Sequence, residues 1–153
     1  MKSTFKFLMG LITLVLFSFA TSSCAKPGDD VDSNNIVGKW KLVKTLDENY
    51  NDGELTNRNE ENCTDWWRVL EFKADGTGYE THYTEGVEDT PPSYPLNWII
   101  EGSNLIISKD SQADHWDIEK LNNKTLIISI IFEQEIYGGG IDKMYYSEIY
   151  ERI

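Results

Sequence analysis

The sequence predicts an all-β domain, an eight-stranded up-and-down antiparallel β-barrel with no major helix. From Ile36 onward, apolar and polar residues alternate with a period of two, which is typical of strands with one buried face. These runs are rich in β-branched and aromatic residues, and turn residues separate them. About eight consecutive strands must hide their edges, and closure into a barrel removes the edges altogether.

Tight turns separate most of the expected strands, so consecutive strands should pair antiparallel. The stretches 47–65 and 85–92 are polar and are expected to form longer loops, and three glycines at 138–140 predict a flexible hairpin tip. Asp, Asn and Gly, which tolerate positive φ, mark the turns Ala74–Thr77, Glu101–Asn104 and Leu121–Lys124. The expected strands are Ile36–Leu46, Trp66–Lys73, Gly78–Thr84, Tyr94–Glu101, Asn104–Ser108, His115–Leu121, Thr125–Phe132 and Lys143–Arg152.

The segment 1–23 precedes this domain and predicts a lipoprotein signal peptide. Two lysines come before a short apolar stretch that ends in small residues, which is the order of regions in a secretory signal. The end of the segment, Thr21-Ser22-Ser23-Cys24, resembles the lipobox of bacterial lipoproteins. The resemblance implies cleavage before Cys24 and acylation of that cysteine by fatty acids such as palmitate. An ordinary signal peptide followed by a coincidental cysteine is the alternative.

Residues 24–35 are polar and predict a flexible acidic tether between the lipid anchor and a barrel domain at 36–153. Ala25, and not Asp, follows the cysteine, which favours sorting to the outer membrane of a Gram-negative cell. The acidic residues Asp29, Asp30 and Asp32 resemble a signal for the cell surface, although a merely solvated linker explains them equally well. We therefore expect an exported outer-membrane lipoprotein on the periplasmic or the cell-surface face.

The charge of the chain excludes one class of partner. Its 153 residues include 14 Lys and Arg against 26 Asp and Glu, which gives a net charge of −12. Loss of the signal segment removes Lys2 and Lys6, so the mature chain would carry 12 basic and 26 acidic residues and a charge of −14. Nucleic acids are bound through clustered Lys and Arg, and the sequence contains no such cluster. We expect no nucleic-acid partner.

The first strand carries a more specific motif, because Gly38 and Trp40 form a Gly-x-Trp pattern. Cys63, the segment Val69–Thr77 and the segment Trp98–Ile107 follow in an order that resembles the lipocalin-like lipoproteins of bacteria. The resemblance implies a lipocalin (calycin-like) barrel in which Gly38 permits a close approach at one end and Trp40 plugs that end. It also implies that Arg152 from the last strand lies over Trp40 in a cation–π contact.

A barrel of this size holds either packed side chains or one small ligand, and both alternatives remain open. Arg68 is the most informative candidate: if buried, it needs a carboxylate from Glu148 or from an acidic ligand, and otherwise it lies at the rim in water. Alternation along the strands predicts an inward-facing candidate set for a small hydrophobic or aromatic ligand. The set is Trp66, Arg68, Phe72, Tyr79, Tyr83, Trp98, Trp116, Phe132 and Tyr146.

No catalytic motif, cofactor motif or metal site is found, so an enzyme is not expected. The acidic stretch 47–54 is similar to a calcium loop, but its glycine and its twelfth position do not fit. Cys63 has no partner once Cys24 is acylated, and its acidic surroundings should raise the pKa of this free thiol.

The competing interpretation is a non-enzymatic interaction protein with a filled barrel, such as a protease inhibitor or a subunit of an envelope complex. Its loops or outer face would bind an envelope protein or a glycan. Trp67, Ile127 and Ile131 are expected to face outward and to form an apolar patch for such a partner.

Overall fold

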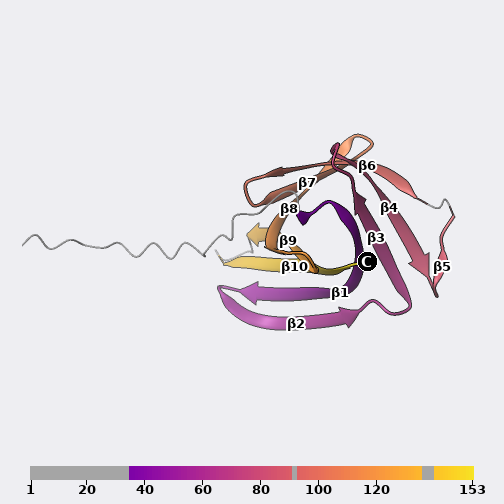
Figure 1. The fold of residues 1–153 in the computed structure, drawn as a ribbon. Coiled ribbons are helices and arrows are strands. Elements are labelled where there is room, and N and C mark those ends of the chain that lie inside the picture. Colours follow the sequence, from indigo (N-terminus) through magenta and orange to yellow (C-terminus); the bar gives the residue numbers. More distant parts are fainter. Residues whose placement is uncertain (1–34, 91–92, 136–139) are drawn as a thin grey trace, which may run out of the picture.

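A computed structural model describes residues 35–90, 93–135 and 140–153, and these residues form one antiparallel sheet (Figure 1). In this part of the chain, no helix is long and apolar enough to cross a membrane. The expected lipoprotein segment, Cys24 and the tether lie outside the described residues, except for Asn35. The strands are β1 (Gly38–Asn51), β2 (Glu54–Asn62), β3 (Trp66–Phe72), β4 (Thr77–Thr84), β5 (Val87–Glu88), β6 (Tyr94–Glu101), β7 (Asn104–Lys109), β8 (Gln112–Leu121), β9 (Thr125–Glu135) and β10 (Ile141–Arg152).

The sheet closes into a barrel, which confirms the predicted fold class. Its strand order is β10-β9-β8-β7-β6-β4-β3-β1-β2, and an additional pairing of β10 with β1 closes the ring. Eight strands form this ring, and they match the eight strands expected from the sequence. The remaining two, β2 and β5, each pair with one ring strand only.

Strand β2 corrects the expectation of a long loop at 47–65. The first four residues of β1 pair with β3, and from Lys44 onward the same edge of β1 pairs with β2. Every residue of β2 is exposed, so the strand has no apolar alternation for sequence reasoning to detect. Its turn did carry a signal, because Asp52 and Gly53 adopt φ values of 48° and 85°, as in a two-residue hairpin turn.

The core fills the half of the barrel that contains the start of β1 and the end of β10. The fully buried side chains include Trp40, Phe72 and Tyr150 from three different strands, each with an exposed fraction of 1% or less. Leu70, Leu105 and Ile128 pack with them in the same cluster. Burial of this apolar surface is the main stabilising term for a domain that has no disulfide among its described residues.

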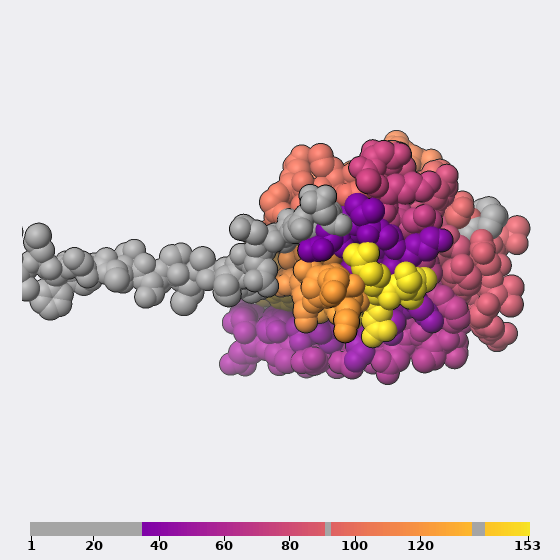
Figure 2. Space-filling view, viewed as in Figure 1, coloured from indigo at the N-terminus to yellow at the C-terminus, as the bar shows by residue number. Residues whose placement is uncertain are grey.

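Arg152 and Trp40 close this end of the barrel in the way that the family resemblance implied. The guanidinium carbon of Arg152 lies 4.4 Å from the centre of the Trp40 ring, and Arg152 donates to the carbonyl oxygens of Val37, at 2.8 Å, and Asn35. Gly38 has φ 140°, and a Cβ there would lie 2.5 Å from Arg152 Nη1, so a side chain would displace this cap. Figure 2 shows the C-terminal residues, in yellow, packed against the first barrel residues, in indigo. We call this the closed end.

Candidate functional site

The pairing of β3 with β4 decides which side chains face the barrel interior. Leu70 is opposite Glu80 and Phe72 is opposite Gly78, so the even-numbered residues of both strands face inward. The expectation that Tyr79 and Tyr83 face inward is therefore wrong.

The inward position of Gly78 has no room for a side chain. A Cβ on Gly78 would lie 2.1 Å from the carbonyl oxygen of Glu71 and 2.8 Å from Leu96, so the strand meets its neighbours too closely for a side chain. This contact joins residues that are distant in sequence, and the alternation pattern does not reveal it.

Tyr79 and Tyr83 belong to the outer wall instead. Tyr83 stacks on Trp67 with 5.5 Å between ring centres, and Lys41 covers the same tryptophan at 4.0 Å. Lys73 lies 4.5 Å from the ring of Tyr79, which is 38% exposed. The expected outer patch is not continuous, because β10 and β1 lie between Trp67 and the isoleucines of β9.

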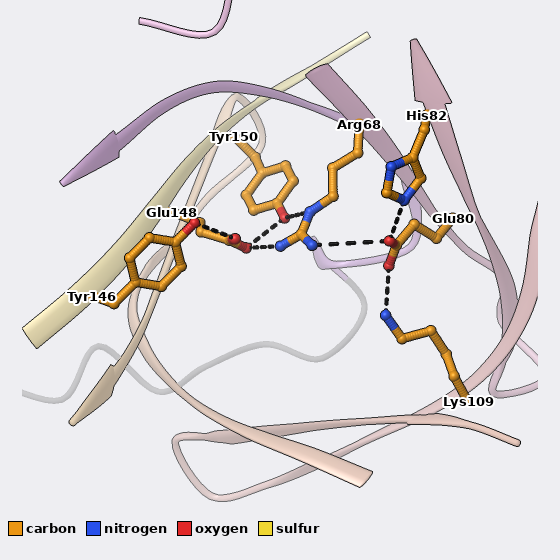
Figure 3. A network of polar contacts seen from close by, with 7 residues as sticks. All are labelled: Arg68, Glu80, His82, Lys109, Tyr146, Glu148 and Tyr150. Atoms are coloured by element: carbon orange, nitrogen blue, oxygen red, sulfur yellow. Dashed lines mark hydrogen bonds and ion pairs between the residues drawn. The ribbon is translucent and has the colours of Figure 1, made fainter. Parts of the chain in front are cut away.

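A polar network crosses the barrel interior at mid-height, above the closed end (Figure 3). Arg68 is its centre: Nε donates to the Tyr150 hydroxyl at 2.8 Å, and Nη2 donates to Glu148. The hydroxyls of Tyr150 and Tyr146 donate to the same carboxylate, at 2.7 and 3.0 Å. The members of the polar network are Arg68, Glu80, His82, Lys109, Tyr146, Glu148 and Tyr150.

Glu80 forms the other half of the polar network. It accepts a hydrogen bond from Lys109 at 2.9 Å and contacts His82 Nε2 at 2.5 Å, and Arg68 Nη1 lies 3.9 Å away. The Glu80 and Glu148 side chains are 6% and 3% exposed, so both carboxylates are buried with their partners in place. Arg68 is 20% exposed, so it does not lie in water at the rim. Its carboxylate partner is Glu148 of the same chain, which was one of the two partners that the sequence left open.

The network shifts the pKa values of its members in directions that keep it intact near neutral pH. Burial alone would raise the pKa of Glu80, but Arg68 and the hydrogen bonds from Lys109 and His82 outweigh burial and lower it. Burial, followed by the charge of Glu148, raises the pKa of Tyr146 and of Tyr150. Burial works against the charge of Arg68, yet Tyr150 and Glu148 raise its pKa above the ordinary value.

Little free space remains around the polar network. The gap between Arg68, Trp116 and Ile128 has a volume of about 10 Å³, which is too small for a ligand. Towards the closed end, Phe72 packs edge-on against Trp98 at 5.5 Å, and the Trp98 indole donates to two backbone carbonyl oxygens. The candidates Phe72 and Trp98 thus belong to the filled core.

The opposite end of the barrel holds the larger free space, and we call it the open end. A hollow of about 740 Å³ lies there, between the β1–β2 and β9–β10 hairpins, and we call it the mouth hollow. Its apolar surface includes Phe132 and Met144, which are 49% and 37% exposed and come from the two strands of one hairpin. The side chains that line it are those of Asn49, Tyr50, Asn51, Thr56, Phe132, Glu133, Gln134, Asp142, Lys143 and Met144.

Of the remaining candidates, Trp116 borders the gap beside Arg68, Tyr146 belongs to the polar network, and Trp66 lies at the rim. Trp116 and Tyr146 are half-buried, face inward and lie 6.2 Å apart by ring centres. Trp66 is 40% exposed at the rim and donates from its indole to Glu61 at 3.2 Å. The structure therefore brings Trp116, Phe132 and Tyr146 to the open end and leaves Trp66 outside it.

Sequence reasoning missed three members of the polar network, namely Glu80, His82 and Lys109. The one-residue register error on β4 hid the first two, and Lys109 was placed just beyond the end of its strand. Their signal was present in the sequence as charged residues at inward positions of strands. Within the described residues, no group of three His, Cys, Asp or Glu side chains could hold a metal ion.

Comparison with known proteins agrees with the geometry of the barrel. The family model of the lipocalin-like domain matches residues 36–128, from two residues before β1 to a position within β9. This match covers more than half of the chain. A search among curated proteins gives no significant match.

Proposed function

Because the chain belongs to the lipocalin-like domain family, we propose that it is a non-enzymatic binding protein that holds a small hydrophobic or aromatic molecule in the open end of its barrel. The mouth hollow is the observation that carries this proposal. Its volume of about 740 Å³ lies in the range of small-molecule sites. Its half-exposed Phe132 and Met144 offer apolar surface that a bound molecule would cover.

The filled lower half of the barrel limits how deep such a ligand can go. The polar network spans the interior, and the gap beside it is about 10 Å³. A ligand would therefore stop at the level of Trp116 and Tyr146, whose rings pair an apolar face with a polar atom. In this arrangement the polar network is the base of the site and the closed end is its support.

We further propose that the protein is exported and anchored to the outer membrane through an acylated Cys24. The support is the order of regions in the first 23 residues and the lipobox-like end of that segment. A tether over residues 24–35 would hold the barrel away from an anionic membrane, from which the net charge of −14 on the mature chain also repels it.

Native mass spectrometry of the full chain, purified from its own host membrane, tests the binding function. The expected result is a co-purifying small molecule that is lost in Phe132→Gln. Ile99→Gln is the matched control, because Ile99 is 52% exposed and lies on the outer wall. A mass that stays in both variants, or no bound molecule in the wild type, would contradict binding at the open end.

Metabolic labelling with a radioactive fatty acid tests the anchor separately. The wild-type chain is expected to carry the label, and Cys24→Ala is expected to lose it. A label that persists in this variant would show that another residue is acylated and that the lipobox interpretation is wrong.

A second candidate function, that of an envelope interaction protein, is favoured by the free edge of β2. All nine residues of β2 are exposed, the strand pairs with β1 on one side, and no described strand pairs with the other side. Unpaired backbone groups on such an edge can accept a strand from a partner. A photo-crosslinking residue at Asn59 would capture that partner in cells, whereas one at Ile99 would not.

A further inference from the structure

We propose that the ligand of the open end is an organic cation, a small molecule with a positive charge beside an apolar or aromatic body. This inference rests on the proposed function and adds the charge of the ligand to it. Three observations carry it: the basic side chains of the site are neutralised, three inward carboxylates are unpaired, and aromatic rings lie between them.

The basic side chains of the site already have carboxylate partners. Arg68 contacts Glu148 and Glu80, and Lys109 lies 2.9 Å from Glu80. At the mouth hollow, Lys143 lies 2.6 Å from Glu133. An anionic ligand beside Arg68 or Lys109 would have to displace Glu80 or Glu148, which would leave a buried carboxylate without its partner. At the mouth hollow, the exposed carboxylate of Glu133 already neutralises Lys143.

Three carboxylates at the open end have no such partner. Asp47, Asp114 and Asp142 share the inward face of their strands with Thr45, Trp116 and Met144 respectively. Within the described part of the chain, no hydrogen bond or ion pair joins these three side chains to another group. Asp142 lines the mouth hollow itself.

The other two aspartates lie beside the aromatic rings of the site. Asp47 is the register partner of Tyr146; burial and Glu148 are the main causes of the raised pKa of that phenol, and the charge of Asp47 adds to them. Asp114 lies two residues before Trp116 on the same face of β8. The open end therefore contains more negative than positive side chains, although its walls are partly apolar.

Carboxylates and aromatic faces together form the environment that stabilises an organic cation. A cation over a tryptophan, tyrosine or phenylalanine face is attracted by the ring, and a nearby carboxylate adds Coulomb attraction. Trp116, Tyr146 and Phe132 supply the rings, and the three aspartates supply the charge. The net charge of −12 on the whole chain also favours the approach of a cation over that of an anion.

Three probes of one shape test the charge of the ligand: phenylbutylammonium, phenylbutanol and phenylbutanoate. Their affinities are measured by ligand-observed NMR on the full chain in lipid nanodiscs, with empty nanodiscs as the blank. Phenylbutylammonium is expected to bind about tenfold more tightly than phenylbutanoate, and added salt should weaken only the ammonium probe. If the alcohol or the carboxylate binds as tightly as the ammonium, the inference is wrong and the binding function stands. If no probe binds, the binding function itself fails.

Two variants locate the interaction of the ammonium group with the protein. The first is Asp142→Asn, and the second combines Asp142→Asn with Asp114→Asn. The single change should weaken phenylbutylammonium about threefold and the double change about tenfold, whereas phenylbutanol should keep its affinity, which also shows that the variants fold. Glu151→Gln is the matched control, because Glu151 is an exposed carboxylate on β10 near the closed end. An unchanged ammonium affinity in the double variant would overturn the proposal.

Discussion

The two ends of the barrel are built from different kinds of side chain. At the closed end, Trp40 is fully buried under Arg152, and Phe72 and Tyr150 are buried with it. At the open end, Phe132 and Met144 remain half-exposed around a hollow of about 740 Å³. The packed core and the proposed binding site are therefore separated along the barrel axis, with the polar network of Figure 3 between them. Substitutions at the two ends should therefore have different effects.

Trp40→Ala should give the largest loss of stability. It removes a fully buried ring and the surface on which Arg152 lies, so the free energy of unfolding should fall by about 3–5 kcal/mol. Trp66→Ala at the open end, where the side chain is 40% exposed, should cost less than about 1 kcal/mol. Urea unfolding measures both values. Equal losses in the two variants would show that the ends do not differ in this way.

Glu148→Leu should have the next largest effect, because it leaves Arg68 inside the barrel without its closest carboxylate. We expect a loss of about 3 kcal/mol in the free energy of unfolding. Addition of Arg68→Met should restore part of that loss, since the pair is then replaced by apolar side chains. A double variant that is less stable than the single variant would mean that the polar network does not act as a unit.

Glu80 should make the stability of the folded protein depend on pH in the acid range. Its pKa in the folded protein lies below the ordinary value of 4.5, so its contribution to stability is present above that pH. This contribution is lost as the pH falls through the lowered pKa, when the carboxylate becomes protonated. The free energy of unfolding, measured down to pH 3, should therefore change less with pH for Glu80→Gln than for the wild type. An equal change in the two proteins would show that another group causes the loss of stability in acid.

Alkylation of Cys63 should report on the region between the two ends, and it requires no substitution. Its thiol is 5% exposed, and burial, followed by the charges of Glu61 and Glu148, raises its pKa. The folded protein should therefore react slowly with iodoacetamide, and the protein in urea should react quickly. Mass spectrometry of the alkylated chain checks this. Fast alkylation under native conditions would show that the barrel opens at this level.

The sequence was sufficient to predict the eight strands of the ring from local patterns and the closed end from the family resemblance. Alternation and turn residues marked the strands, and Gly38, Trp40 and Arg152 followed from the family resemblance. For Cys63, the sequence indicated a free thiol with a raised pKa, although burial is a larger cause than the neighbouring acids.

The open end was harder to predict because long-range contacts determine it. Strand β2 has no apolar side, so it was expected to be a loop. Gly78 faces the core and has no room for a side chain beside Leu96 and the backbone of Glu71, and in the same register Tyr79 and Tyr83 face outward. The partners of Arg68 are 80 residues away in the sequence for Glu148 and 82 for Tyr150, so a strand pattern alone could not choose among the alternatives.

The most direct test of the separation is a titration of the full chain, labelled at its tryptophan side chains, with phenylbutylammonium. Indole N–H signals report on both ends, because Trp40 lies in the core and Trp98 packs against Phe72, whereas Trp116 borders the gap beside Arg68. The expected result is a shift of the Trp116 signal with unchanged Trp40 and Trp98 signals. Shifts at Trp40 and Trp98 without one at Trp116 would contradict binding at the open end.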